Sequence, residues 1–220
     1  FLMDWEATSG RRSGSFEMDR YFWEPDAEAR TDHLAAGAFG PRLGMQIVSS
    51  GPDNLKDDEI RDSFIQMIIL ARKRVLIQTP YFIPDPAFRT ALKIASQSGV
   101  EVSIMMPGVA DHHVVYLASH SFLQELLEYG INLYHYRGFL HAKMVVIDGA
   151  ISSIGTTNID NRSFALNFEI NAFVYNRSFA RRCEEIFEQD LEASYPVDQH
   201  WFSSRPLWWK GAGAVTRLLA

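Results

Sequence analysis

Cysteine is almost absent from the sequence, because Cys183 is the single one among 220 residues. The chain therefore cannot form an internal disulfide. Long apolar runs are also absent: the best candidate, Phe64 to Ala71, is interrupted by Gln66 and is far shorter than the ~20 residues that cross a bilayer. Positive charge is scarce as well, since 21 Lys and Arg face 27 Asp and Glu, for a formal net charge of −6. This balance argues against a broad basic surface, so we expect no nucleic acid partner.

The chain begins with Phe1 rather than Met and carries no signal peptide. We therefore expect it to be a fragment of a longer polypeptide. Hydrophobic residues make up 47% of the sequence, which is enough for one sizeable domain. No cluster of carboxylates or of Cys and His has the spacing of a metal site, so we expect no metal and no other cofactor.

A short segment in the second half carries most of the chemical information. It reads H-x-K-x4-D at His141, Lys143 and Asp148, and the sequence Gly-Thr-Thr-Asn follows over residues 155–158. The residues on either side of Asp148-Gly149 are apolar and β-branched, which predicts a β-hairpin with a tight turn at that dipeptide.

Side chains alternate along a strand, so His141 and Lys143 are expected to project from the same face of the first hairpin strand. An imidazole and an ammonium group side by side are costly to desolvate unless an anion meets them. The loop at residues 155–158 adds hydroxyl and amide donors. Together these groups predict a phosphate site.

Around this hairpin, strands alternate with helices, which predicts βαβ units and a mixed sheet covered on both faces, an α/β fold. Asp53 or Asn54 is expected to cap the first of these helices, and the basic residues 72–74 are expected to close it. The expected strands are 45–49, 75–79, 100–106, 131–136 and 167–175, and the expected helices are 55–73, 86–97, 112–129 and 178–193.

The motif resembles the signature of the phospholipase D superfamily, which is H-x-K-x4-D followed by G-[ST]-x-N. Further phrases are similar to the second lobe of bacterial cardiolipin synthases, and the similarity extends over the whole chain. These phrases are QIVSSGP at 46–52, TPYFIPD at 79–85, GTTNIDNRS at 155–163, LNFEIN at 166–171 and RPLW at 205–208. The resemblance implies a phospholipase D-like mixed sheet flanked by helices on both faces, an α-β-α sandwich.

The resemblance also implies roles for individual residues. His141 would attack phosphorus while its other ring nitrogen is held by Glu169, a carboxylate in an otherwise apolar strand. Lys143 would hold the phosphate. Asp148, at the hairpin turn, would brace the loop or Lys143 rather than touch substrate.

Two further residues complete the phosphate site implied by the resemblance. The Thr156 hydroxyl and the Asn158 amide would donate hydrogen bonds to the phosphate oxygens. The reaction would pass through a phosphohistidine intermediate and require no metal.

Three regions are expected along the chain. Residues 1–44 are the end of an upstream lobe plus a connector, residues 45–199 are the catalytic lobe with one motif, and residues 200–220 are an aromatic and basic tail. Because two-step transfer uses two imidazoles, a second motif is expected from an upstream lobe or from a second copy of the chain. The tryptophans of the tail suit either a membrane interface or packing against the domain.

The expected function is phosphatidyl transfer, in which two phosphatidylglycerols form cardiolipin and glycerol. This implies an anionic phospholipid substrate, a membrane surface as partner, and a place at the bacterial cell membrane, with spanning segments that this chain does not contain. One alternative is a phospholipase or nuclease that uses water as the acceptor. Another is a non-catalytic lobe that completes a partner's active site.

Overall fold

The computed structural model describes residues 43–52, 58–109, 113–206 and 209. The chain divides into two units between Arg42 and Leu43. Residues 1–42 of the expected upstream segment and connector, and the expected helix caps at Asp53 and Asn54, lie outside the described residues.

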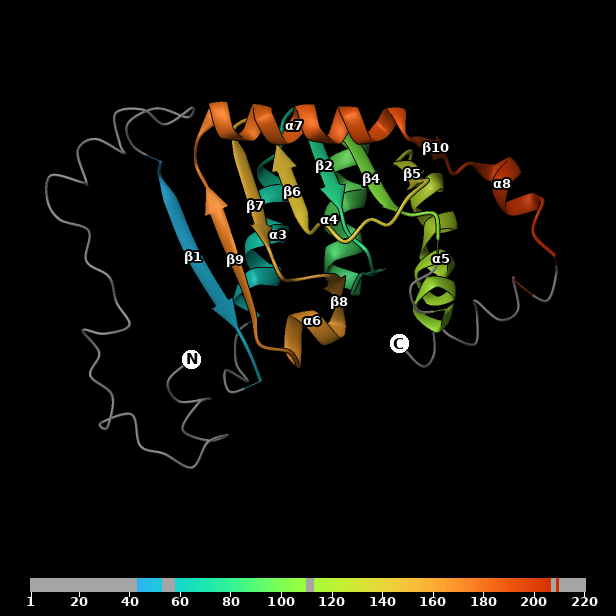
Figure 1. Ribbon diagram of the computed structural model, residues 1–220, viewed down its shortest axis with the longest axis horizontal. Coiled ribbons are helices and arrows are strands. Elements are labelled where there is room, and N and C mark those ends of the chain that lie inside the picture. The colour runs from blue at the N-terminus through green and yellow to red at the C-terminus, as the bar shows by residue number, and fades with distance from the viewer. Residues whose placement is uncertain (1–42, 53–57, 110–112, 207–208, 210–220) are drawn as a thin grey trace, which may run out of the picture. The chain divides into compact units, whose positions relative to one another are not determined.

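A single large sheet forms the centre of the described unit (Figure 1). Its eight strands follow the order β1-β9-β7-β6-β2-β4-β5-β10. The pairs β2–β4 and β4–β5 are parallel and the other ladders are antiparallel, so the sheet is mixed as predicted. The strands are β1 (Met45–Ser50), β2 (Arg74–Gln78), β4 (Glu101–Pro107), β5 (Asn132–Tyr136), β6 (Met144–Ile147), β7 (Ile151–Gly155), β9 (Glu169–Val174) and β10 (Ser194–Pro196).

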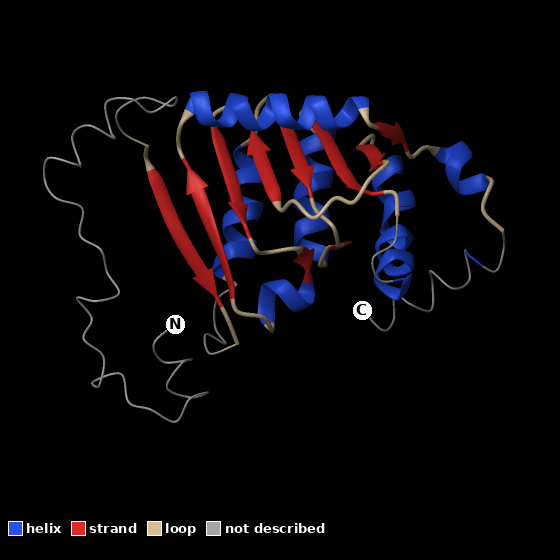
Figure 2. Cartoon of the chain, in the orientation of Figure 1, coloured by secondary structure: helices blue, strands red, loops and turns tan. Residues whose placement is uncertain are grey.

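Helices cover both faces of this sheet, as expected for an α-β-α sandwich (Figure 2). Alternate residues of the central strand point to opposite faces, so Val75 and Ile77 join one apolar cluster and Leu76 joins another. The first cluster holds side chains of α3 (Glu59–Leu70), α4 (Pro86–Gln97) and α5 (His113–Glu128), and the second holds those of α7 (Arg177–Glu192). The remaining short elements are β3 (Phe82–Ile83), β8 (Ile159–Asp160), α6 (Asn161–Ala165) and α8 (Gln199–Ser203).

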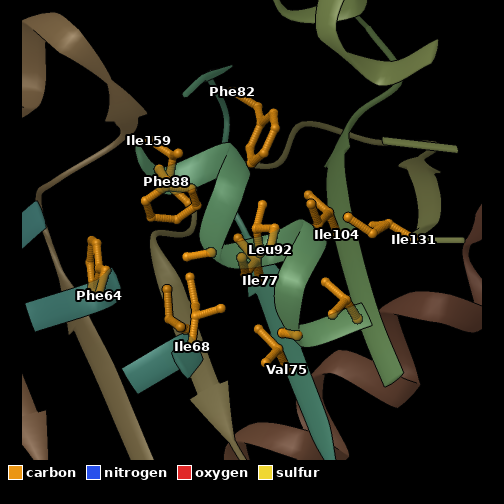
Figure 3. Packing of buried hydrophobic residues seen from close by; sticks show 14 of the residues in the cluster. Phe64, Ile68, Val75, Ile77, Phe82, Phe88, Leu92, Ile104, Ile131 and Ile159 are labelled. Carbon is orange, nitrogen blue, oxygen red and sulfur yellow. The ribbon is translucent and has the colours of Figure 1, made fainter. Parts of the chain in front are cut away.

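The larger cluster forms the main core (Figure 3). Phe64 and Ile68 of α3 and Phe88 and Leu92 of α4 lie in one cluster with the sheet residue Ile77, and all five side chains are almost fully buried. Each such side chain stabilises the fold by about 1.5–3 kcal/mol through burial of apolar surface. This packing fixes the strands whose ends carry the polar loops.

The helix over 86–97 begins and ends where the sequence predicts. The Asp85 carboxylate accepts a hydrogen bond from the Phe88 N–H, and Pro86 occupies the first turn, where its missing N–H costs nothing. Gly99 follows the helix with φ of 87°, a conformation that favours glycine.

The prediction that residues 72–74 close the preceding helix is wrong. Helix α3 ends at Leu70, and no basic residue lies in its last turn. The backbone of the basic residues turns away because the Asp148 carboxylate accepts hydrogen bonds from the N–H groups of Arg72, Lys73 and Arg74. A contact distant in sequence thus overrides the local dipole preference.

The first part of the predicted tail packs against the domain. Trp201, Phe202 and Trp209 belong to or border the main core cluster, and the guanidinium carbon of Arg205 lies 4.0 Å from the centre of the Trp201 ring. Within the described ranges, no helix combines the length and apolarity that crossing a membrane requires.

Trp201 contacts two buried histidines, His120 and His135, and Trp209 contacts the first of them. The Nε2 atoms of His120 and His135 lie 2.9 Å apart, and Nδ1 of His120 lies within hydrogen-bond distance of the Tyr116 carbonyl oxygen. A carbonyl only accepts, so Nδ1 of His120 carries the proton, its Nε2 accepts, and Nε2 of His135 donates. The Trp201 ring stacks on His120 at 5.2 Å.

Burial keeps both rings neutral. It lowers the pKa of His120 to about 4, although the hydrogen bond to Tyr116 opposes the shift. Burial, followed by the nearby His120 and Arg205, lowers the pKa of His135 to about 3. In the unfolded chain each ring returns to an ordinary pKa of 6.5, so the unfolded state binds more protons below that pH.

We therefore expect the free energy of unfolding to be unaffected by this pair above pH 6.5 and to fall by a few kcal/mol between pH 6.5 and about 4.5. Denaturant unfolding followed by tryptophan fluorescence measures this. The slope of the free energy of unfolding against pH should fall in His120→Gln by the equivalent of up to about one proton. It should not change in His200→Gln, because His200 lies at an exposed position of α8. An unchanged stability of the wild-type protein between pH 6.5 and 4.5 would contradict the assignment.

Candidate active site

The predicted hairpin is present as β6 and β7. Asp148 and Gly149 have φ of 55° and 56°, and the Ala150 N–H donates to the Ile147 carbonyl oxygen at 2.9 Å. Two consecutive positive φ angles are the geometry that Asp-Gly favours in tight turns. The strand itself begins only at Met144, so His141 and Lys143 lie in the segment just before it rather than on it.

Asp148 lies at the far end of β6 from the histidine. Four strand residues separate it from Lys143, which places the two about 16 Å apart at the usual strand rise. Its carboxylate accepts hydrogen bonds of 2.8, 2.8 and 2.9 Å from the backbone N–H groups of Arg72, Lys73 and Arg74. The structure therefore places Asp148 as a brace between the hairpin turn and the start of β2, away from Lys143.

His141 is exposed and lies between two aromatic rings. The Phe139 ring stacks on it at 5.6 Å with an angle of 11° between the planes, and the Tyr81 ring meets it edge-on at 6.3 Å. Phe139 is itself 73% exposed. The imidazole thus contacts two rings while the residue stays exposed to solvent.

Lys143 is half-buried, and its ammonium group donates a hydrogen bond of 3.0 Å to the His141 carbonyl oxygen. Burial lowers the pKa of Lys143, whereas Glu169 and Asp160 oppose that shift. Both carboxylates therefore lie within electrostatic reach of the ammonium group. The sequence pattern predicts the first of them but not the second.

Glu169 is the first residue of β9 and is partly buried. Its Oε1 atom accepts a hydrogen bond of 3.2 Å from the Asn167 amide. Among the residues that the structure describes, no hydrogen bond joins Glu169 to His141. Glu169 thus acts on Lys143 through its charge. The predicted contact between Glu169 and the His141 imidazole stays a prediction.

The loop after β7 is held from behind by a buried amide. Oδ1 of Asn171 accepts a hydrogen bond of 2.7 Å from the Thr157 hydroxyl, and Nδ2 donates one of 2.9 Å to the Ser153 hydroxyl. Gly155 lies so close to Asn171 and to the Ile170 carbonyl oxygen that any Cβ atom there would overlap with both. This explains why glycine begins the Gly-Thr-Thr-Asn sequence.

The two predicted phosphate donors have different surroundings. Thr156 is exposed, and its hydroxyl accepts a hydrogen bond of 3.0 Å from the Ile170 N–H, so it is engaged with the backbone of β9. Nδ2 of Asn158 donates at 3.2 Å to the hydroxyl of Ser163. The Asp160 carboxylate in turn accepts from the Ser163 N–H at 2.6 Å and caps α6.

Several residues of this site were not assigned a role from the sequence. Tyr81, Asp160, Ser163 and Asn171 all occur in the phrases that resemble the relatives, and that resemblance is the only sequence signal for them. The hydrogen-bond register of β3 and β8 pairs Phe82 with Ile159. If the same register extends by one residue toward the N-terminus, the backbone of Tyr81 lies beside that of Asn158.

The donor groups of the site are nitrogen-rich and suit an anion. In the described parts of the chain, no group of three or more His, Cys, Asp or Glu side chains could hold a metal ion. The imidazole, the ammonium group and the Asn158 amide instead offer a nucleophile, a positive charge and a donor, which phosphoryl transfer requires.

Comparison with known proteins gives one family. A family model described as "Cardiolipin synthase, PLD-like domain" matches residues 64–191. The "Cardiolipin synthase" of Listeria monocytogenes is 41% identical over 221 residues, covering 100% of this chain and 43% of the relative. "Cardiolipin synthase 2" of Staphylococcus epidermidis is also 41% identical and covers 100% of this chain and 42% of that relative. The chain thus spans less than half the length of these relatives.

Solved structures support the fold. The phosphatidylserine synthase of Haemophilus influenzae has a TM-score of 0.65 at 14% identity, covering 80% of this chain and 45% of that one. Nuc of Salmonella typhimurium, described as a phospholipase D family member, has a TM-score of 0.60 at 18% identity, covering 72% and 100%. The predicted phospholipase D-like sheet is therefore confirmed.

The close approach at Gly155 predicts a local steric effect. We expect Gly155→Ala to destabilise the fold by about 1–3 kcal/mol, because the new methyl group must displace Asn171 and the loop that it holds. Thermal and denaturant unfolding measure the loss. Gly44→Ala is the control, since the nearest atom to its added Cβ is 3.6 Å away, and equal stability losses in the two variants would contradict this explanation.

The contacts of Asp148 predict a role in stability. Asp148→Asn keeps a residue that tolerates positive φ but replaces one accepting oxygen with a donor, so we expect a loss of about 1–3 kcal/mol. Activity per folded molecule should stay near that of the wild-type protein. Asp62→Asn, at an exposed side chain on α3, serves as the control. A stable but inactive Asp148→Asn protein would instead place the carboxylate in catalysis.

Proposed function

Because the chain belongs to the cardiolipin synthase family of phospholipase D-like proteins, we propose that it is a catalytic lobe of a phosphatidyltransferase. The observation that carries the proposal is the half-buried ammonium group of Lys143, which is hydrogen-bonded to the backbone carbonyl oxygen of His141, a residue whose side chain is exposed. A positive charge and a nucleophile so placed suit a phosphodiester. The substrate is an anionic phospholipid, phosphatidylglycerol, and the products are cardiolipin and glycerol.

The reaction proceeds in two displacements. A ring nitrogen of His141 attacks the phosphorus of one phosphatidylglycerol, the bond from phosphorus to the glycerol oxygen breaks, and that oxygen takes up a proton. The hydroxyl of a second phosphatidylglycerol then attacks phosphorus, the phosphorus–nitrogen bond breaks, and the hydroxyl proton leaves to a base. Lys143 stabilises the charge on the phosphoryl oxygens in both steps.

Asn158 is well placed to assist. Its Oδ1 atom is buried and has no hydrogen-bond partner in the described parts of the chain. Rotating the amide by half a turn keeps a hydrogen bond with Ser163, which then donates, and directs Nδ2 toward the unpartnered side. Because that position is closed to solvent in this structure, the amide donates to a phosphoryl oxygen only after the side chains that cover it move aside. Thr156, whose hydroxyl already contacts the β9 backbone, contributes through its position in the loop.

Glu169 and a second imidazole complete the mechanism. Glu169 holds the other ring nitrogen of His141 when substrate neutralises Lys143. The proton donor and acceptor is a histidine of a second motif, supplied by an upstream lobe of the polypeptide or by a second copy. The side chains of His120 and His135 are buried and hydrogen-bonded to each other, so they are not available as the proton donor and acceptor. This supports a histidine from outside the described residues.

The alternative acceptor is water, which would make the protein a phospholipase or nuclease. The net charge of −6 gives little support for a nucleic acid substrate. A purely structural lobe is a weaker reading, because the exposed imidazole and the half-buried ammonium group are both in place. We place the protein at the bacterial cell membrane, where its lipid substrate lies.

The product distinguishes these functions. The full-length polypeptide, incubated with labelled phosphatidylglycerol, should yield a four-chain lipid and glycerol, which thin-layer chromatography separates from phosphatidate. His141→Ala should lower turnover by at least about a thousandfold because the nucleophile is lost, with an unchanged circular dichroism spectrum. His200→Ala is the matched control. Phosphatidate as the sole product would favour the hydrolase, and near-normal turnover by His141→Ala would remove His141 from catalysis.

A further inference from the structure

The segment that leads into β6 has one buried side chain between two exposed ones. Leu140 is buried in the apolar cluster that holds the side chains of α7, together with Leu76 of β2 and Met144 of β6. The residues on either side of it, Phe139 and His141, are both exposed. Their rings contact each other, so burial of Leu140 leaves both neighbours on the same outer side of the segment.

The ring of Phe139 is not an isolated exposed side chain. A single exposed phenylalanine is ordinary at a protein surface and needs no explanation. This ring, however, lies nearly parallel to the His141 imidazole, with 5.6 Å between the ring centres and 11° between the planes, an arrangement that aromatic rings favour. Tyr81 meets the same imidazole at 85° and 6.3 Å. Two rings of different orientation therefore contact the candidate nucleophile.

Other contacts hold the backbone of His141 but not its ring. The His141 carbonyl oxygen accepts a hydrogen bond of 3.0 Å from the Lys143 ammonium group, and Leu140 holds the preceding residue in the apolar cluster. In the described parts of the chain, no hydrogen bond restrains the ring nitrogens of His141. Exposed side chains exchange rotamers within picoseconds to nanoseconds, so an unrestrained imidazole would direct a nitrogen at phosphorus only part of the time.

We propose that Phe139 is a positioning residue for the candidate nucleophile. Its ring restricts the plane of the His141 imidazole, so that the attacking nitrogen is directed at phosphorus before substrate binds. A nucleophile must lie about 3–3.5 Å from the atom that it attacks, and small misplacements lower the rate strongly. Phe139 acts through His141 and supplies no atom to the reaction. The inference rests on the proposed attack of His141 on phosphorus and adds what orients the imidazole.

Glycerol release measures the step in which His141 acts. The full-length polypeptide is mixed with phosphatidylglycerol labelled in its headgroup glycerol, and the rate of release is measured against lipid concentration. Phe139→Ala should lower kcat about ten- to a hundredfold and change KM less than about threefold, because the groups that bind phosphate stay in place. Phe139→Tyr keeps the ring and should restore kcat to within about threefold of the wild-type value.

Phe139→Leu separates ring stacking from apolar contact. Leucine keeps an apolar side chain but has no flat ring, so kcat should stay at least about fivefold below that of the wild-type protein. Tyr175→Ala is the matched control and should keep the wild-type kcat, because this ring is also exposed and follows the end of β9 opposite to Glu169. A wild-type kcat in Phe139→Leu or in Phe139→Ala would overturn the positioning role.

Contact with a membrane is the competing role for an exposed phenylalanine, and the physical form of the substrate distinguishes the two. Short-chain phosphatidylglycerol below its micelle-forming concentration offers no membrane surface. Phe139→Ala should lower kcat on this lipid by the same factor as on vesicles of long-chain phosphatidylglycerol. A loss of activity confined to vesicles would assign the ring to the membrane and overturn the positioning role.

Failure of the proposed function gives a different result. Glycerol release is the first step both of transfer to a second lipid and of hydrolysis, so the Phe139 variants test positioning with either acceptor. Release at the wild-type rate by His141→Ala, or no release by the wild-type protein, would overturn both inferences. An inactive His141→Ala protein together with a fully active Phe139→Ala protein would overturn the positioning role alone.

Discussion

The half-buried ammonium group of Lys143 is the constraint on which the site depends. Taking a positive charge partly out of water is unfavourable, and burial accordingly lowers its pKa. The fold meets this cost with carboxylates from two other elements, Glu169 at the start of β9 and Asp160 at the start of α6. Neither forms a hydrogen bond with the ammonium group among the described residues, so the charge is supported at a distance and can accept an anionic substrate.

The elements that bring these groups together are held by a second layer of buried polar contacts. Asn171 links the loop after β7 to the inner face of β9, and Gly155 allows the two backbones to approach closely. Ser163 joins Asn158 to the capped start of α6. These contacts hold the loop from behind. The Lys143 ammonium group keeps further donors for a substrate beyond the one that it gives to the His141 carbonyl oxygen.

The sequence predicts the strands and helices better than it predicts which loop residues come together at the site. The alternation of β-branched strands with capped helices was enough to predict a mixed sheet between helices, and Asp148-Gly149 was enough to predict the hairpin turn. Helix α3 ends earlier than the basic residues suggested, because Asp148 binds their backbone from a distant part of the chain. Tyr81 and Asp160 are positioned by the short ladder between β3 and β8. Each of these strands has only two residues, which is too short for a periodic pattern to be seen in the sequence.

The central claim is that His141, Lys143 and Asn158 converge on one phosphoryl group. A crystal structure of the full-length polypeptide with vanadate, which adopts the geometry of phosphorus under attack, tests it most directly. The vanadium should lie within bonding distance of a ring nitrogen of His141, with its oxygens about 2.7–3.2 Å from the Lys143 ammonium and the Asn158 amide. Vanadate bound elsewhere, or bound without contact to His141 and Lys143, would contradict the account.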